Sequence, residues 1–254
     1  MQDGERSSET ATLAGVDLAW QSKRNPTAIA AGSLSGRKLK IASVHEQLYT
    51  ANAVLETLTN VPNLRGIAID APLIIKNQSG QRDCEKAIGR EYGSRHASCH
   101  TSNLTKFPDS DAALLSERLV AEGFTHLGST SECWQIECYP HPALIELFKL
   151  PMRLPYKRGR VGEKRSGQAT LARLLSSLSG EGYLTLEVPE GFRHYFDPDY
   201  IAQLKGKALK HNEDVLDSVI CLIVAAFYQL GMQDRVFGSA GDGYIYVPEV
   251  EQLP

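Results

Sequence analysis

The stretch HNEDVLDSVICLIVAAFYQLG, residues 211–231, decides the class of fold to which this chain belongs. Its segment 215–230 is apolar almost all the way round, which predicts a helix buried on every side. The start of this helix is nevertheless acidic, because Asp214 and Asp217 lie three residues apart and point the same way. Asn212 is a candidate N-cap, and the dipole of a helix favours acids in its first turn. The alternative is that these carboxylates serve a functional site.

The composition around this helix is that of a globular protein. The chain has 254 residues, of which 42% are hydrophobic, and its formal net charge of -3 excludes a uniformly basic nucleic-acid-binding protein. Five cysteines, an odd number, suit reduced thiols and a cytoplasmic location. The longest apolar run, 219–227, is about half of the ~20 residues that a membrane span needs. We expect a disordered tail over 1–12 and a single domain over 13–254, with inserted loops near 76–106 and 149–165.

The patterns upstream of the helix predict a mixed α/β fold. Short polar connections join three apolar runs, which favours consecutive antiparallel strands over 12–20, 26–34 and 39–48. A helix predicted at 50–60 precedes a buried strand at 65–73, which should therefore pair in parallel. The later predicted elements are helices over 111–123, 141–150 and 167–179 and strands over 134–140 and 241–248.

Acids occupy positions in these strands where apolar residues are expected. Asp17 lies in GVDLAW, Asp70 in AIDAPL and Glu137 in QIECYP. Burying a carboxylate without a partner costs free energy. Either each acid has its own partner, from hydrogen-bond donors or an arginine, or all of them share one positively charged partner. Carboxylates that are brought together raise one another's pKa unless positive charge lies among them. A hard divalent cation is the shared explanation, and oxygen ligands favour Mg²⁺ or Mn²⁺ over zinc.

Five motifs along the chain carry a resemblance to a known family. They are GVDLAW (15–20), AIDAPL (68–73), RDCEKAIG (82–89), ECYPHPALIELF (137–148) and HNEDVLDSVICLIVAAFY (211–228). In this order and at this spacing, the sequence resembles a bacterial and archaeal family of predicted nucleases in the RNase H-like superfamily, catalogued as a domain of unknown function. The resemblance runs from residue 13 to about residue 248, which is nearly the whole chain.

The resemblance implies a fold and an acidic catalytic site. The fold is α/β and RNase H-like, with a mixed five-stranded sheet of three antiparallel strands followed by parallel strands, and with helices on both faces. The implied metal ligands are Asp17, Asp70, Asp214 and Asp217. The spacing of the last two most resembles the RuvC-like resolvase branch, in which His211 would also lie near the site. Glu137 matches the family's motif, and it completes the predicted catalytic set together with His211.

The predicted function is hydrolysis of phosphodiester bonds in nucleic acid by a two-metal mechanism that uses Mg²⁺ or Mn²⁺. Basic residues flank the acids in sequence, since 149–165 holds seven lysines and arginines and 76–106 holds six. Such loops can bind substrate phosphates, although basic runs are more often solvated surface. The predicted substrate-binding residues are Arg82, Lys157, Arg158 and Arg165.

Two other functions are consistent with the same acids. A Mg-dependent phosphotransferase or ATPase of the related actin-like fold also places acids around Mg²⁺, but this sequence has no Gly-rich phosphate-binding motif. A non-catalytic nucleic-acid-binding protein that keeps the scaffold is the other alternative, and homodimerisation is left open. A zinc site is less favoured, because its candidate ligands lack standard spacing; they are Cys84, His96, Cys99 and His100.

Overall fold

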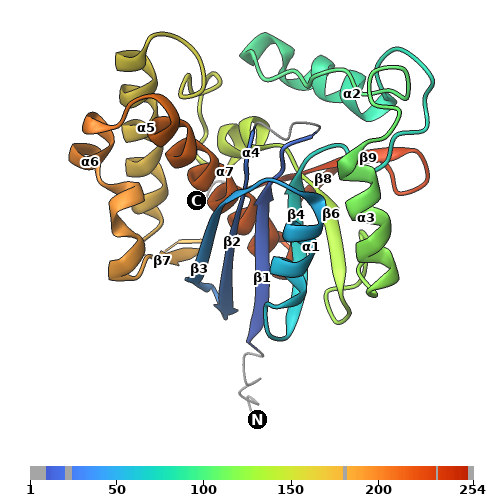
Figure 1. Ribbon diagram of the computed structural model, residues 1–254, viewed down its shortest axis with the longest axis horizontal. Helices are drawn as coiled ribbons and strands as arrows, with labels where there is room; N and C mark the ends of the chain where they lie inside the picture. The colour runs from blue at the N-terminus through green and yellow to red at the C-terminus, as the bar shows by residue number, and fades with distance from the viewer. Residues whose placement is uncertain (1–9, 21–24, 180–181, 233, 251–254) are drawn as a thin grey trace, which may run out of the picture.

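A sheet of seven strands lies at the centre of the computed structural model, which describes residues 10–20, 25–179, 182–232 and 234–250 (Figure 1). The strands lie in the order β5-β6-β4-β1-β2-β3-β7, so the first strand is in the middle of the sheet. Their bounds are β1 (Ala11–Asp17), β2 (Thr27–Ser35), β3 (Lys38–Leu48), β4 (Leu64–Asp70), β5 (Thr125–His126), β6 (Trp134–Glu137) and β7 (Thr185–Glu187).

The directions of pairing follow from the connections between the strands. β1 pairs with β2, and β2 with β3, in antiparallel hairpins. β4 is reached through helix α1 (Ala51–Thr59), and it pairs in parallel with β1. β6 continues the parallel part of the sheet beside β4. The predicted mixed α/β sheet, with antiparallel strands first and parallel strands later, is therefore confirmed.

The predicted count of five strands is wrong, because short strands extend the sheet at both edges. β5 has two residues and β7 has three. Strands this short show no alternation of apolar residues, so the sequence does not reveal them. A separate two-stranded sheet contains the predicted strand β9 (Gly243–Pro248) and also β8 (Asp234–Ser239), for which the sequence makes no prediction.

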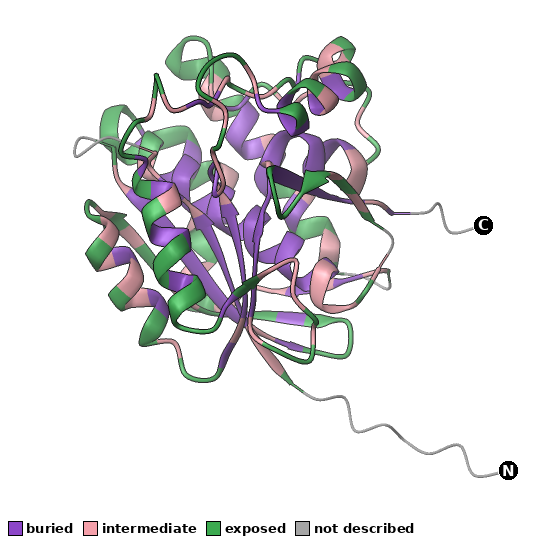
Figure 2. Ribbon diagram, turned by 90° about the vertical axis from the view of Figure 1, so that its right-hand side faces the viewer, coloured by how far each residue is buried: buried purple, intermediate pink, exposed green. Residues whose placement is uncertain are grey.

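Helices cover both faces of the sheet, and Figure 2 shows buried residues gathered in the layers between them. α1 and α3 (Asp111–Ala121) pack on one face, where Val54 and Leu115 belong to the same hydrophobic cluster as Val16 of β1. The other face carries α4 (Pro140–Leu147), α5 (Val161–Ser176) and α7 (Gly206–Gln229) (Figure 1). The remaining elements are α2 (Asp83–Tyr92), α6 (Pro198–Gln203) and 3-10 helices at Gly93–Arg95, Ser177–Ser179 and Glu190–Phe196.

Helix α7 is apolar all round because it lies between the sheet and other elements. It contacts β1, β2, β3 and β4, and also α4, α5 and β9. Every residue from Asn212 to Phe227 is buried. The predicted N-cap role of Asn212 is wrong, because the helix begins at Gly206 and the Asn212 amide donates to Gln168 Oε1 at 3.1 Å. Asp214 and Asp217 therefore lie well inside the helix, where its dipole does not explain them.

Gly15 allows the backbone of α7 to lie directly on β1. A Cβ atom at Gly15 would lie 2.0 Å from the backbone nitrogen of Leu222 and 2.2 Å from the carbonyl oxygen of Ser218. Only glycine permits such a close approach. Asp17 lies two residues further along β1 and, by the alternation of side chains in a strand, on the same face as Gly15. The glycine thus places the carboxylate of Asp17 against the acidic part of α7.

Both predicted loops are partly helical, and this corrects their assignment as loops. α2 and a 3-10 helix occupy part of 76–106. α5 begins at Val161, inside 149–165, because Glu163 Oε2 accepts a hydrogen bond from the Arg160 backbone N–H at 2.5 Å and caps the helix. β1 begins at Ala11, so the last two residues of the predicted tail, Ala11 and Thr12, belong to the sheet; residues 1–9 lie outside the described part of the chain.

Candidate active site

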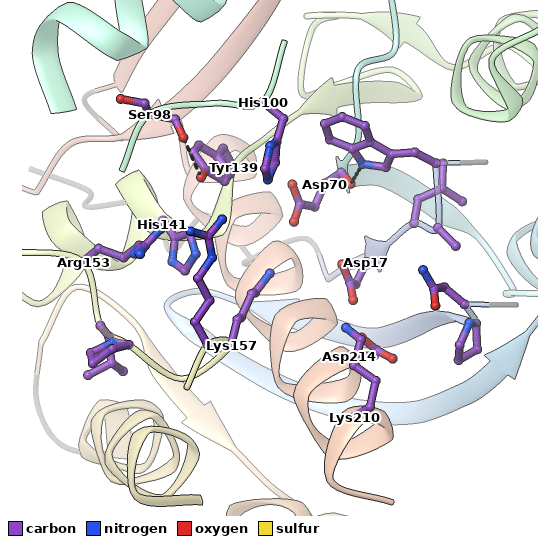
Figure 3. A pocket seen from close by; sticks show the side chains of 18 residues that line it. Asp17, Asp70, Ser98, His100, Tyr139, His141, Arg153, Lys157, Lys210 and Asp214 are labelled. Atoms are coloured by element: carbon purple, nitrogen blue, oxygen red, sulfur yellow. Dashed lines mark hydrogen bonds and ion pairs between the residues drawn. The ribbon is translucent and has the colours of Figure 1, made fainter. Parts of the chain in front are cut away.

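A cavity of about 460 Å³ opens at the carboxyl ends of β1 and β4, beside α7. Figure 3 shows carboxylates on one side of it and basic or aromatic side chains on the other. The carboxylates that line it are Asp17, Asp70 and Asp214. The labelled residues on the opposite side include His100, Tyr139, His141, Arg153 and Lys157, and Arg158 also lines the cavity. Carboxyl ends of parallel strands are common places for functional sites in α/β folds.

Asp17 and Asp70 are side by side because β1 and β4 pair in register. The two residues are direct partners in the parallel ladder, so their side chains leave the sheet on the same face. Each ends its strand, and neither is fully buried. Trp20 supports the turn beside them, since its Nε1 donates to the Asp70 carbonyl oxygen at 3.2 Å. Burial raises the pKa of the Asp70 carboxyl well above its usual value, opposed by Lys157 and reinforced by Asp17.

Asp214 faces these two acids from α7. Its Oδ1 accepts a hydrogen bond from Lys210 Nζ at 2.5 Å, whereas its buried Oδ2 has no hydrogen-bond donor among the described residues. The Asp214 carboxyl lies within hydrogen-bonding reach of the Asp17 carboxylate, an acceptor that can bind it only when one of the two acids is protonated. Burial and then the nearby Asp17 charge raise the pKa of Asp214 to about 8, although Lys210 opposes the shift. The Asp214 carboxyl therefore holds a proton at neutral pH, unless further positive charge enters the cavity.

Asp217 lies beneath the cavity and is held by two residues of the segment between α4 and α5. It is fully buried, and its Oδ1 accepts a hydrogen bond from the Tyr156 hydroxyl at 2.6 Å. Lys157 Nζ lies 2.8 Å from its Oδ2. Burial raises the pKa of Asp217 to about 6, because the opposing charge of Lys157 only partly compensates. Neither Asp217 Oδ2 nor Asp214 Oδ2 accepts a hydrogen bond of good geometry from a described residue, but the Lys157 ammonium lies beside Asp217 Oδ2 as an ion-pair partner.

Glu137 lies on the opposite face of the sheet from Asp17 and Asp70. Its partner in the ladder is Ile69, the neighbour of Asp70, so alternation points the two acids to opposite sides. Arg82 neutralises it there, with Nη1 donating to Glu137 Oε2 at 2.9 Å. The Leu73 backbone N–H donates to the same oxygen, also at 2.9 Å. The Glu137 carboxylate therefore holds the turn after β4.

Arg82 is buried in this network. Its Nε donates to Glu85 Oε1 at 2.8 Å, and its Nη1 also donates to the Ile74 carbonyl oxygen at 3.0 Å. Glu85 in turn accepts hydrogen bonds from the Ser102 backbone N–H at 3.1 Å. The guanidinium thus ties α2 to the turn after β4, and its donors point into the protein instead of the cavity.

Two other predicted site residues also lie away from the cavity lining. His211 is half-buried on α7. Arg165 lies on α5, where its Nε donates to the Leu204 carbonyl oxygen at 2.6 Å. Of the four predicted substrate-binding residues, Lys157 and Arg158 line the cavity. The structure therefore brings together three of the predicted acids and two of the predicted cations.

Several residues that line the cavity are not among those that the sequence patterns predict. Tyr139 and His141 lie within four residues of the end of β6, and polar residues after a buried strand could have indicated them. Lys210 precedes Asp214 by four residues on α7, a spacing that brings two side chains together on a helix. Arg153 lies in the basic segment 149–165, but nothing in the sequence distinguishes it from its neighbours there.

Two lysines bring positive charge next to the acids. Lys210 bridges Glu213 and Asp214, and Lys157 pairs with Asp217. Among the described residues, no three His, Cys, Asp or Glu side chains are grouped as a ready-made metal site, and this also applies to the zinc alternative. The donors nevertheless suit a hard cation in their chemistry, because they are carboxylate oxygens and no described residue donates a hydrogen bond to Asp214 Oδ2.

The fold and the cavity define the class: a mixed α/β protein with an acidic cavity at the carboxyl ends of neighbouring parallel strands. The chain belongs to the family described as "Protein of unknown function (DUF429)", whose model matches residues 15–240. Neither the curated proteins nor the solved structures gave a match. None of the helices in the described ranges is long and apolar enough to cross a membrane.

Proposed function

We propose that this protein is a metal-dependent nuclease of the RNase H-like superfamily. The observation that carries the proposal is the in-register pair Asp17 and Asp70, with Asp214 on the same side of the cavity and no hydrogen-bond donor to its Oδ2 among the described residues. Three carboxylates at one cavity need positive charge to be ionised together, and the raised pKa values of Asp70 and Asp214 reflect this need. Substrate phosphates alone would increase the repulsion between negative charges, so we expect a cation to bind at these carboxylates before a phosphate-containing substrate does.

The sheet supports the assignment to this superfamily. An antiparallel β3-β2-β1 unit continues through β1 into the parallel strands β4 and β6, which is the order that the resemblance implies. The acids come from the first strand, the fourth strand and the last long helix, also as implied. β5 and β7 are additions at the edges and leave this central order unchanged.

Asp17, Asp70 and Asp214 are the proposed ligands of Mg²⁺ or Mn²⁺, and Asp217 positions Lys157. Bound cations would supply Lewis-acid chemistry, which activates a water and stabilises the leaving oxygen of a phosphodiester. The side chains of the chain itself must make room for them. Lys210 holds Asp214 Oδ1, so it has to release that oxygen or share the acid. Lys157 stays with Asp217 and keeps positive charge beside Asp70.

The test is a cleavage assay on end-labelled DNA and RNA, each in single-stranded, duplex and branched form. Cleavage that requires Mg²⁺ or Mn²⁺, stops in EDTA and is absent from Asp70→Asn would support the proposal. Lys210→Met gives a sharper measurement, because it keeps the alkyl chain and removes the competing ammonium group. We expect this variant to bind Mn²⁺ more tightly than the wild type by electron paramagnetic resonance. Equal affinity would show that Asp214 is not a ligand.

A phosphotransferase or phosphohydrolase acting on a small molecule is the second candidate, and the size of the cavity favours it. Its volume of about 460 Å³ lies in the range of small-molecule sites, roughly 300–1,000 Å³. Release of phosphate from nucleotides in Mg²⁺, without cleavage of any nucleic acid, would replace the nuclease by this candidate. The same carboxylates would serve both reactions, so only the substrate separates them.

A further inference from the structure

His141 is a buried histidine whose ring is turned toward the cavity without a partner. It is 7% exposed and lines the cavity from the first turn of α4 (Figure 3). Its Nδ1 has no hydrogen-bond partner among the described residues. Unpaired polar atoms at such depth are costly, and in native proteins they commonly have a functional reason.

Two tyrosines fix the His141 ring without satisfying it. The ring centroids of Tyr139 and Tyr156 lie 5.6 Å and 5.4 Å from that of His141, both in edge-on geometry. Each tyrosine hydroxyl is used elsewhere, since Tyr139 donates to the Ser98 carbonyl oxygen and Tyr156 donates to Asp217. The imidazole is therefore held in place by packing, and its buried Nδ1 is left without a hydrogen-bond partner among the described residues.

The charge around His141 is positive and is not balanced by acids on its side of the cavity. Arg153 and Arg158 line the cavity beside it, and in the described part of the chain neither guanidinium has an ion-pair or hydrogen-bond partner. Burial holds the pKa of His141 well below its usual value, with further contributions from Lys157, Arg153 and Arg158. The imidazole is thus neutral, and the two arginines supply two positive charges without counter-ions.

We propose that His141, Arg153 and Arg158 form a subsite for a phosphomonoester group, opposite the carboxylates. A phosphomonoester carries about -1.5 to -2 charges near pH 7, which matches two guanidinium groups, whereas a phosphodiester carries only one. The neutral imidazole would donate one hydrogen bond to a phosphate oxygen. The subsite adds a substrate preference to the proposed function, and the substrate class inferred from it rests on that function. The substrate class is a strand with a terminal phosphate, or a nucleotide that carries the same group.

The experiment measures binding without catalysis, by titration calorimetry in EDTA. The probes are one short oligonucleotide with a 5′-phosphate or a 5′-hydroxyl, and a nucleoside 5′-monophosphate with its nucleoside. The variants are His141→Phe, which keeps the ring and its edge contacts, and Arg153→Gln. Arg160→Gln is the matched control, because it removes one positive charge from the same segment at an exposed position outside the cavity lining. Circular dichroism and melting of every variant check the fold.

We expect each phosphorylated probe to bind about tenfold tighter than its unphosphorylated form, which corresponds to one charge-assisted contact. His141→Phe and Arg153→Gln should remove most of this difference, and Arg160→Gln should keep it. If His141→Phe does not fold, the comparison of Arg153→Gln with Arg160→Gln still tests whether the preference for phosphorylated probes depends on the subsite. The larger gain, in oligonucleotide or in mononucleotide, identifies the source of the phosphate.

Equal binding of phosphorylated and unphosphorylated probes to the wild type would overturn the subsite, as would an equal loss in Arg160→Gln. Its failure is distinguishable from that of the proposed function, because hydrolysis in Mg²⁺ is measured separately. Cleavage of nucleic acid without a preference for phosphate would remove the subsite and leave the nuclease. A phosphate preference without any cleavage would leave the subsite and remove the nuclease.

Discussion

The acids that end β1 and β4 differ from the acid that ends β6 in how their charge is neutralised. Glu137 points to one face of the sheet, and Arg82 and the Leu73 backbone N–H bind its carboxylate fully within the protein. Asp17 and Asp70 point to the other face and into the cavity, where Asp214 adds a third carboxylate. In sequence all three strand acids interrupt apolar runs in the same way, so the sequence pattern alone does not separate a structural acid from a functional one.

The difference between the two sets is a difference in what their removal does. Loss of a neutralised acid leaves an unpaired arginine and costs stability. Loss of an acid that repels its neighbours removes electrostatic repulsion from the folded protein, but it also removes a proposed metal ligand. Each of the following changes tests this contrast.

The largest effect is expected for Asp17→Asn on catalysis. The variant keeps the size of the side chain and loses a charged ligand, so nuclease activity should fall on the order of 1000-fold, equivalent to about 4 kcal/mol in the barrier. Its melting temperature should be equal to or above that of the wild type. The control is Asp83→Asn, an exposed acid that pairs with Lys86 and lies outside the cavity lining. A fully active Asp17→Asn variant would remove Asp17 from the metal site.

Glu137→Gln should have its main effect on stability. The change leaves the buried Arg82 guanidinium with less negative charge, and breaking a buried ion pair costs about 3 kcal/mol. Urea denaturation monitored by circular dichroism measures the loss of unfolding free energy. Unchanged stability together with abolished cleavage would place Glu137 in the catalytic set, and the contrast between the two faces would then be lost.

Mg²⁺ should stabilise the protein through the cavity acids alone. A ligand that binds only the folded state adds about 2.7 kcal/mol at a concentration of 100 times Kd. We expect this increase in the wild type and in Glu137→Gln, and little of it in Asp214→Asn. Thermal denaturation with a Mg²⁺ titration, against EDTA, provides the measurement. Equal shifts in all three proteins would show that the cation binds elsewhere.

The smallest expected effect is a pH dependence of the metal-free protein that depends on Asp214. The pKa of Asp214 is about 8 in the folded protein, whereas the carboxyl of the unfolded chain has the usual 3.8. Between these two pKa values the folded protein keeps Asp214 protonated, whereas the unfolded chain does not. The contribution of this group to stability is therefore at its maximum below the unfolded pKa. It is lost as the pH rises through the folded pKa.

Asp214→Asn stays neutral and lacks this loss. Relative to the wild type in EDTA, it should gain on the order of 2 kcal/mol of unfolding free energy between about pH 6 and about pH 9. Urea denaturation of both proteins at the two pH values tests the sign and the size. A constant difference would mean that the Asp214 carboxyl is already ionised at neutral pH, and that Lys210 neutralises it as fully as Arg82 neutralises Glu137.

Local patterns predicted most of the fold, and the errors have physical causes. The length of the connections indicated which strands pair in antiparallel and which in parallel. β5 and β7 are too short for a periodic signal, and Asn212 has the composition of an N-cap but lies inside a helix that starts at Gly206. Part of the site followed from the same patterns, because the ends of β1 and β4 bring Asp17 and Asp70 to one cavity.

The sequence by itself determined that a helix buried on all sides carries acids, and that acids interrupt the neighbouring strands. Only the tertiary structure decided which of them are neutralised. Arg82 and Glu137 are 55 residues apart in the chain, yet they are in contact. Charges interact over a few ångströms in space, and a shift of one residue in register moves a side chain to the other face of a sheet. Both depend on how the elements pack, which local composition does not encode.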